Sequence, residues 1–215
     1  MLTLSEELFL LSIDDDKGLV TAYVSDSLRY GLAGALLAEL ALQNKIALRD
    51  KRLEQVDQTN TGDLLFDEVL GHISQGKHLR KATYWVNAIA SKKLVKQIAV
   101  HLAQKNILRI EEKRYLWIIP YEAYPQVDAS AKYWVKQRLR NVVLANEEPD
   151  SQTVVLFSLL KTCHLLDLVF TRDELKAARK KVDILVKGET FGPIVAQTIE
   201  EIQAAASAAV IAATG

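Results

Sequence analysis

The chain lacks several features that mark particular classes of protein. It has one cysteine, Cys163, among 215 residues, which excludes an intrachain disulfide framework and is typical of a reducing compartment. Its 27 basic residues are balanced by 27 acidic ones, so any anion site must be a local patch. A secretory signal is not expected, because Glu6 and Glu7 interrupt the N-terminal apolar run and no basic segment precedes it. The apolar run 204–213 is shorter than the roughly 20 residues that span a bilayer, so we expect a soluble, cytoplasmic protein.

The patterns that would indicate catalysis or metal binding are also missing. The four histidines fall on separate predicted elements, and none has the spacing of a metal site. Cys163 and His164 are neighbours in sequence and point in different directions, which argues against a nucleophilic dyad. The triple aspartate 14–16 lacks calcium-loop spacing, and Gly31 and Gly34 do not form a nucleotide loop after a strand. We expect no enzymatic activity, no cofactor and no metal.

What the chain does have is hydrophobic periodicity, which predicts a mainly α-helical fold. For example, Leu94, Ile98 and Leu102 share one helix face. No repeat or linker divides the sequence, so we expect one domain over residues 1–215. The expected helices cover residues 3–12, 26–43, 64–73, 79–91, 92–105, 128–146 and 151–168, then a helix from 171 and another over 194–213. Short strands are expected at 19–23 and 46–48, followed by a charged loop over 49–60.

A β-hairpin is predicted over residues 107–120. Its strands are 107–110 and 115–119, and its turn is 111–114. The second strand contains an unbroken apolar run, so one face needs a covering layer. We therefore expect an oligomer or membrane contact, carried by Tyr115, Leu116, Trp117 and Ile118. The alternative is a hairpin folded back over the helices.

Several motifs give the chain a family resemblance. Gly31-Leu32 is followed by Glu39-Leu40-Ala41-Leu42, and Gly62-Asp63 is followed by Asp67-Glu68. A third motif is His101 to Leu108, just before the hairpin. In this order the motifs resemble the Golgi phosphoprotein 3 family, whose eukaryotic members bind phosphatidylinositol 4-phosphate on membranes. The resemblance implies a buried, apolar central helix surrounded by amphipathic ones, and the segments from Val154 or from Ala204 suit that role.

The resemblance also implies where a lipid headgroup would bind. The family's pocket has one tryptophan and three arginines, and the matching positions here are Val24, Ala33, Lys92 and Val95. Because one of the four is basic, we expect weak or altered binding of acidic headgroups. The basic residues that remain near these positions are Arg29, Lys92, Lys93 and Lys96. The alternative is a solvated lysine face.

These observations predict a peripheral, adaptor-like protein on the cytoplasmic face of a membrane. Its expected partners are acidic phospholipid headgroups, bound weakly, a second copy of the chain through the 107–120 hairpin, and an unidentified protein. The family's eukaryotic members also carry a basic N-terminal tail that engages vesicle coats. No such tail precedes the first predicted helix, so we expect a divergent, prokaryotic member without coat recruitment.

Two alternatives from other classes remain open. Two helices followed by a hairpin resemble a winged helix, which could bind nucleic acid through residues 132–140 or through the helix that begins at Lys92. The neutral net charge makes nucleic acid the weaker choice. The second alternative is a purely structural protein-interaction domain.

Overall fold

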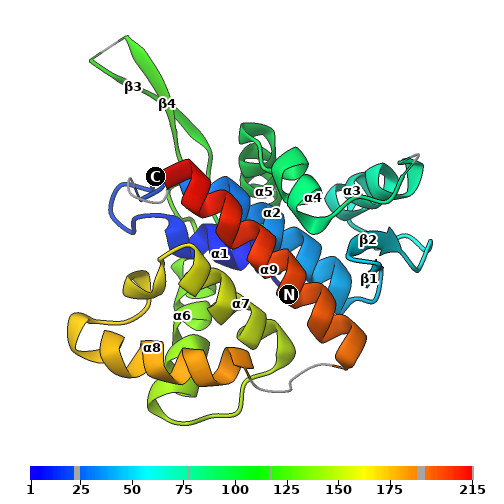
Figure 1. Cartoon of the computed structure of the whole chain (residues 1–215). Coiled ribbons are helices and arrows are strands. Elements are labelled where there is room, and N and C mark those ends of the chain that lie inside the picture. Colours follow the sequence, from blue (N-terminus) through cyan, green and yellow to red (C-terminus); the bar gives the residue numbers. More distant parts are fainter. Residues whose placement is uncertain (22–24, 77, 117, 188–191, 215) are drawn as a thin grey trace.

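The computed structural model describes residues 1–21, 25–76, 78–116, 118–187 and 192–214, and it confirms a mainly α-helical fold with small β-hairpins (Figure 1). The helices are α1 (Leu4–Ser12), α2 (Ser25–Leu42), α3 (Leu64–Gln75), α4 (Ala82–Ile89), α5 (Lys92–Gln104), α6 (Ala129–Leu144), α7 (Ser151–Thr162), α8 (Arg172–Lys187) and α9 (Pro193–Thr214). A short 3₁₀ turn, Leu166–Leu168, lies between α7 and α8.

Two antiparallel hairpins accompany the helices. β1 (Ile46–Arg49) pairs with β2 (Arg52–Gln55), and β3 (Glu111–Tyr115) pairs with β4 (Ile119–Ala123). The first is closed by Asp50 and Lys51, whose φ angles of 48° and 59° suit the tight turn of a two-residue hairpin. The segment expected as a charged loop over 49–60 therefore contains a strand, β2.

The expected buried apolar helix is present, and more than one helix fills the centre of the fold. All nine residues of α1 are buried, and residues 153–160 of α7 are buried as well. α2 packs against both and against α9, with its residues from Leu32 to Ala38 buried. The two glycines of α2 permit this close packing, since a Cβ at Gly31 would lie 2.4 Å from Cys163 Sγ and one at Gly34 would lie 3.0 Å from Ala206 Cβ.

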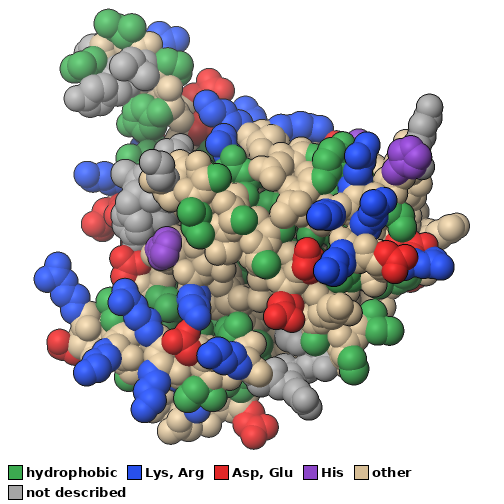
Figure 2. All heavy atoms as spheres, in the orientation of Figure 1, with side chains coloured by type: hydrophobic (Ala, Val, Ile, Leu, Met, Phe, Trp, Pro, Cys, Tyr) green, Lys and Arg blue, Asp and Glu red, His purple; other side chains and the backbone are tan. Residues whose placement is uncertain are grey.

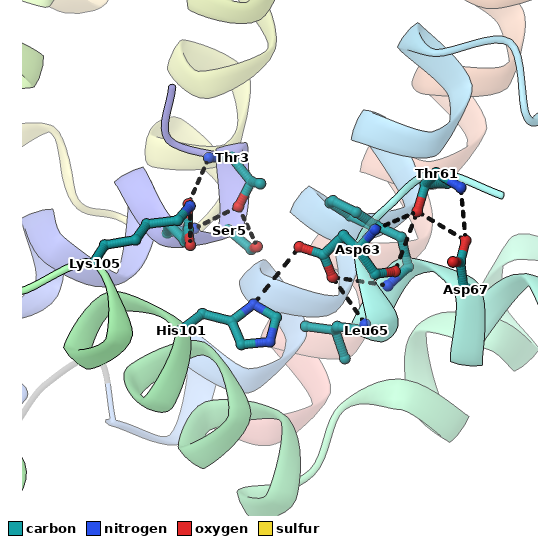
Figure 3. A network of polar contacts seen from close by, with 10 residues as sticks. Thr3, Ser5, Thr61, Asp63, Leu65, Asp67, His101 and Lys105 are labelled. Atoms are coloured by element: carbon teal, nitrogen blue, oxygen red, sulfur yellow. Dashed lines mark hydrogen bonds and ion pairs between the residues drawn. The ribbon is translucent and has the colours of Figure 1, made fainter.

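α1 begins with a capping box. The Thr3 hydroxyl accepts from the Glu6 N–H at 3.3 Å, and the Glu6 carboxylate accepts from the Thr3 N–H at 2.8 Å. Glu6 also pairs with Lys105 at the end of α5, at 2.7 Å. Figure 3 shows this contact beside the one between His101 and Asp63, the N-cap of α3. The N-termini of α1 and α3 are thus both tied to the last turns of α5.

The C-terminal apolar helix is longer than the run 204–213 suggested. α9 has 22 residues, and within the described part of the chain it is the one helix long and apolar enough to cross a membrane by length and composition. The core helix of a soluble protein meets the same criteria, and α9 packs against α2 and α4 through residues such as Ile202 and Ala206. The helix predicted over 194–213 is confirmed, whereas the run 204–213, which was judged too short to span a bilayer, is only part of that helix.

Other boundaries differ from the predictions. No strand covers 19–21, where the structure has an isolated bridge between Ile13 and Val20, and residues 22–23 lie outside the described part. The helix expected over 151–168 ends at Thr162, because His164 has a φ of 57°, which a helix cannot continue through.

The main correction concerns the second hairpin. The predicted turn 111–114 belongs to strand β3, and the predicted second strand 115–119 contains the end of β3, the start of β4 and the connection between them. Both faces of β3 reach solvent, since Glu112, Lys113 and Arg114 are exposed, so charged residues are tolerated there and hydrophobicity does not mark the strand. The β3–β4 hairpin projects away from the helices (Figure 1), which excludes the folded-back alternative for this structure.

Candidate functional site

A groove of about 760 Å³ lies between the N-terminal half of α5, the start of α2 and the base of the β3–β4 hairpin. Its charged lining consists of Lys92, Glu112 and Glu122. Its other lining residues are apolar or aromatic: Leu19, Val20, Leu28, Val95, Pro120, Tyr121 and Tyr124. Four basic residues were predicted for a headgroup site, and among the described residues only Lys92 lines this groove.

Lys92 owes its position to the start of α5. Ser91 caps this helix by accepting a hydrogen bond from the Leu94 N–H at 3.1 Å, and Lys92 is the first helical residue. It is exposed and makes no ion pair within the described part of the chain. The first turn of α5 contains no acidic residue, so the positive end of the helix dipole is not neutralised there. An anion in the groove would meet the Lys92 ammonium group.

The other predicted basic residues each have a partner within the chain. Lys93 pairs with Glu68 of α3 at 2.9 Å, and Lys96 pairs with Glu122 of β4 at 2.9 Å. Arg29 lies over the Tyr30 ring, 4.9 Å from its centroid, and donates to the Tyr30 hydroxyl at 3.2 Å. The four residues therefore do not form one cationic cluster.

Two carboxylates of the groove were missed from the sequence. Glu112 and Glu122 are directly opposite each other in the β3–β4 ladder, so their side chains share one face of the hairpin. Glu122 accepts hydrogen bonds from Lys96 and from the Tyr124 hydroxyl, both of which lower the pKa of Glu122. Burial, with this hydrogen bond, raises the pKa of Tyr124, which keeps the phenol neutral. Had β3 been placed at residues 111–115, the strand register would have predicted that Glu112 faces Glu122.

The fold and this groove can be compared with known proteins. A sequence model of the family described as Golgi phosphoprotein 3 (GPP34) matches residues 4–202. The chain belongs to the Golgi phosphoprotein 3 family. Vacuolar protein sorting-associated protein 74 of Schizosaccharomyces pombe is 28% identical over 76% of this chain and 56% of its own length. The protein of that name from Eremothecium gossypii is 27% identical over 77% of this chain and 57% of its own. The chain thus spans little more than half the length of these relatives.

The four positions matched to the family's headgroup pocket lie in different surroundings in this Golgi phosphoprotein 3 family member. Val24 lies outside the described residues. Ala33 is fully buried in α2 and does not line the groove. Lys92 and Val95 both line it, one turn apart on α5. Two of the three described positions are therefore at the groove surface, and they contribute one charge.

The residues predicted for oligomer or membrane contact lie around the hairpin tip. Leu116 is 67% exposed and Ile118 is 80% exposed. Figure 2 shows hydrophobic side chains gathered at the end of the projecting β3–β4 hairpin. Trp117 lies outside the described residues, as does the side chain of Tyr115. The tip and the groove share one hairpin, because Pro120 and Tyr121 of β4 line the groove.

The basic residues of α6, the main candidates for nucleic-acid binding, are held by carboxylates of the same chain. Lys132 and Lys136 both pair with Asp15. Arg138 pairs with Glu7 at 2.7 Å. Arg140 makes a two-pronged pair with Glu174, at 2.6 and 2.8 Å, which lowers the pKa of Glu174 to about 2. A face whose cations are already neutralised is poorly suited to a DNA backbone. Among the described residues no group of three or more His, Cys, Asp or Glu side chains could hold a metal ion.

Proposed function

We propose that this chain is a non-enzymatic, peripheral adaptor that binds acidic phospholipid headgroups weakly in the groove beside α5. The observation that carries the proposal is Lys92, a cation without an ion pair at an apolar-lined groove. A membrane surface fits this groove better than a soluble anion does, because the exposed apolar tip at Leu116 and Ile118 belongs to the same hairpin. The names of the curated relatives, which refer to vacuolar protein sorting, agree with a role at membranes.

The expected affinity is low and sensitive to salt. A lysine near an anionic surface contributes about 1 kcal/mol, and one free lysine with a short apolar tip gives weak attraction. We expect little preference for phosphatidylinositol 4-phosphate over phosphatidylserine, since the groove lacks an arginine that could bind a phosphate with two hydrogen bonds. We further propose that the hairpin tip forms contacts between copies of the chain, and that a protein partner, unidentified, completes the adaptor.

Vesicle sedimentation at low and moderate salt tests the lipid proposal. The double change Lys92→Glu and Lys93→Glu should abolish association with acidic vesicles. Lys92→Gln alone should account for most of this loss, because Lys93 is paired with Glu68.

The matched control is Lys176→Glu with Lys180→Glu, which makes the same change of net charge on exposed residues of α8. α8 carries the basic face seen at the lower left of Figure 2. Association that survives the α5 change and is lost with the α8 change would place the membrane contact on α8. No association of the unaltered protein with any acidic vesicle would refute the proposal.

A further inference from the structure

The groove contains a free anion as well as a free cation. Lys92 on α5 and Glu112 on β3 both line it, and neither forms an ion pair or hydrogen bond within the described part of the chain. Glu122, the third charged lining residue, pairs with Lys96 at 2.9 Å. Arg114, two residues after Glu112 on the same face of β3, is exposed and is not among the described lining residues. The lining residues without an ion pair are thus one positive and one negative.

The two carboxylates make this groove unfavourable for a ligand that is purely anionic. Glu112 and Glu122 are opposite each other on adjacent strands, a placement that brings like charges to about 5 Å between Cβ atoms. Lys96 pairs with Glu122 and also attracts Glu112, which has no ion pair of its own within the described part of the chain. A phosphate held by Lys92 alone would be repelled by Glu112. If the phosphate belongs to a headgroup that also carries a cation, Glu112 would attract that cation.

We propose that the groove recognises a primary ammonium group beside a phosphodiester, which makes phosphatidylserine and phosphatidylethanolamine its ligand class. This inference rests on the proposed function. Lys92 binds the phosphodiester, and Glu112 accepts hydrogen bonds from the ammonium. The apolar wall of Leu19, Val20 and Val95 receives the glycerol and the first carbons of the acyl chains.

The same charges explain which headgroups are excluded. An inositol phosphate adds negative charge and offers no cation to Glu112. A quaternary choline carries a cation without an N–H, so it cannot donate to the carboxylate. Phosphatidylglycerol has the net charge of phosphatidylserine and lacks its ammonium, and this difference permits a test at constant surface charge.

The experiment compares vesicles that contain equal mole fractions of phosphatidylserine or of phosphatidylglycerol in phosphatidylcholine. The intact protein should bind the phosphatidylserine vesicles about three- to fivefold more tightly. This ratio of affinities corresponds to the free energy of one partly exposed ion pair. Glu112→Gln should make the two affinities equal by strengthening the binding of phosphatidylglycerol. Lys92→Gln should weaken both. The matched control is Glu111→Gln, because Glu111 points to the opposite hairpin face and pairs with Arg109 and Lys113.

The outcomes separate this inference from the proposed function. Equal binding of the two acidic lipids by the intact protein would overturn the inference and leave the proposed function standing. A phosphatidylserine preference that survives Glu112→Gln, or that Glu111→Gln also removes, would overturn the assignment to Glu112. No binding of either lipid would overturn the proposed function and the inference together.

Discussion

Replacing Gly31 by alanine should destabilise the protein, although alanine is the better helix former. Gly31 lies on α2 where this helix passes the end of α7. An added Cβ would lie 2.4 Å from Cys163 Sγ and 3.2 Å from Leu8 Cδ2. Cys163 and Leu8 are both buried, and a cysteine side chain is too short to swing away. The helices must therefore separate to admit the methyl group.

The net effect is a difference between two opposing contributions. Overpacking a well-packed core costs typically about 1–3 kcal/mol. Alanine in place of glycine in a helix interior returns about 1 kcal/mol. Because the contact at 2.4 Å is far below any normal approach, we expect the upper part of the cost and a net loss of about 1–2 kcal/mol. Gly71→Ala on α3 is the matched control: its Cβ would meet Gln75 Nε2 at 4.0 Å, so this change should stabilise by about 0.5–1 kcal/mol.

Thermal and urea unfolding followed by circular dichroism measure both changes. For a chain of this size 1 kcal/mol shifts Tm by about 2–4 °C, so Gly31→Ala should lower Tm by about 2–8 °C and Gly71→Ala should raise it. Adding Cys163→Ala to Gly31→Ala should restore part of the loss, giving a coupling of about 1 kcal/mol in a double-mutant cycle. If Gly31→Ala raised Tm as Gly71→Ala does, the close packing of α2 on α7 would be wrong.

Three further predictions follow from other parts of the structure. Burial raises the pKa of Glu39, so the native state binds this proton more tightly than the unfolded state does, and the contribution of Glu39 to stability falls as the pH rises above 4.5. Glu39→Gln should remove this loss, so its urea midpoint should exceed that of the unaltered protein at pH about 7 and equal it well below pH 4.5. The double change Leu116→Ser and Ile118→Ser should yield a folded monomer by light scattering. Ile184 is also exposed, and Ile184→Ser should leave the oligomeric state unchanged. An unaltered protein that is monomeric at high concentration would contradict the proposed oligomer. Burial raises the pKa of the Cys163 thiol to about 12, so iodoacetamide should label it only upon unfolding, and rapid labelling of the native protein would disprove its burial.

The helices were predictable because their information is local. In α5 the stripe of Leu94, Ile98 and Leu102 falls within one short segment, and the structure confirms that this stripe is buried. The Thr3 capping box of α1 is equally local, since its two residues are three positions apart. What periodicity could not reveal is the order of the layers: a helix that is apolar all round signals burial without saying which neighbours bury it. The choice of Val154 or Ala204 for the central helix was therefore incomplete.

The hairpin was misplaced because its strands are not defined by burial. β3 projects from the body of the fold, so nothing selects apolar residues along it, and the apolar run that looked like a strand begins at the end of β3 and forms the turn. Leu116 occupies the left-handed region there with a φ of 48°. Since the register was wrong, Glu112 was assigned to a turn, and the carboxylate pair that it forms with Glu122 could not be foreseen.

The basic residues show why a local cluster of charge is weak evidence for a binding site. Lys92, Lys93 and Lys96 lie within five residues, and a helix turns neighbouring residues to different faces. The partners that then neutralise Lys93 and Lys96 are 25 and 26 residues away in sequence, on α3 and β4. Only the tertiary fold decides which cation has no ion pair, and here Lys92 and Glu112 both line the groove without one among the described residues. The charge that a ligand meets is therefore that of the unpaired residues, and in this groove these residues favour a headgroup carrying both signs.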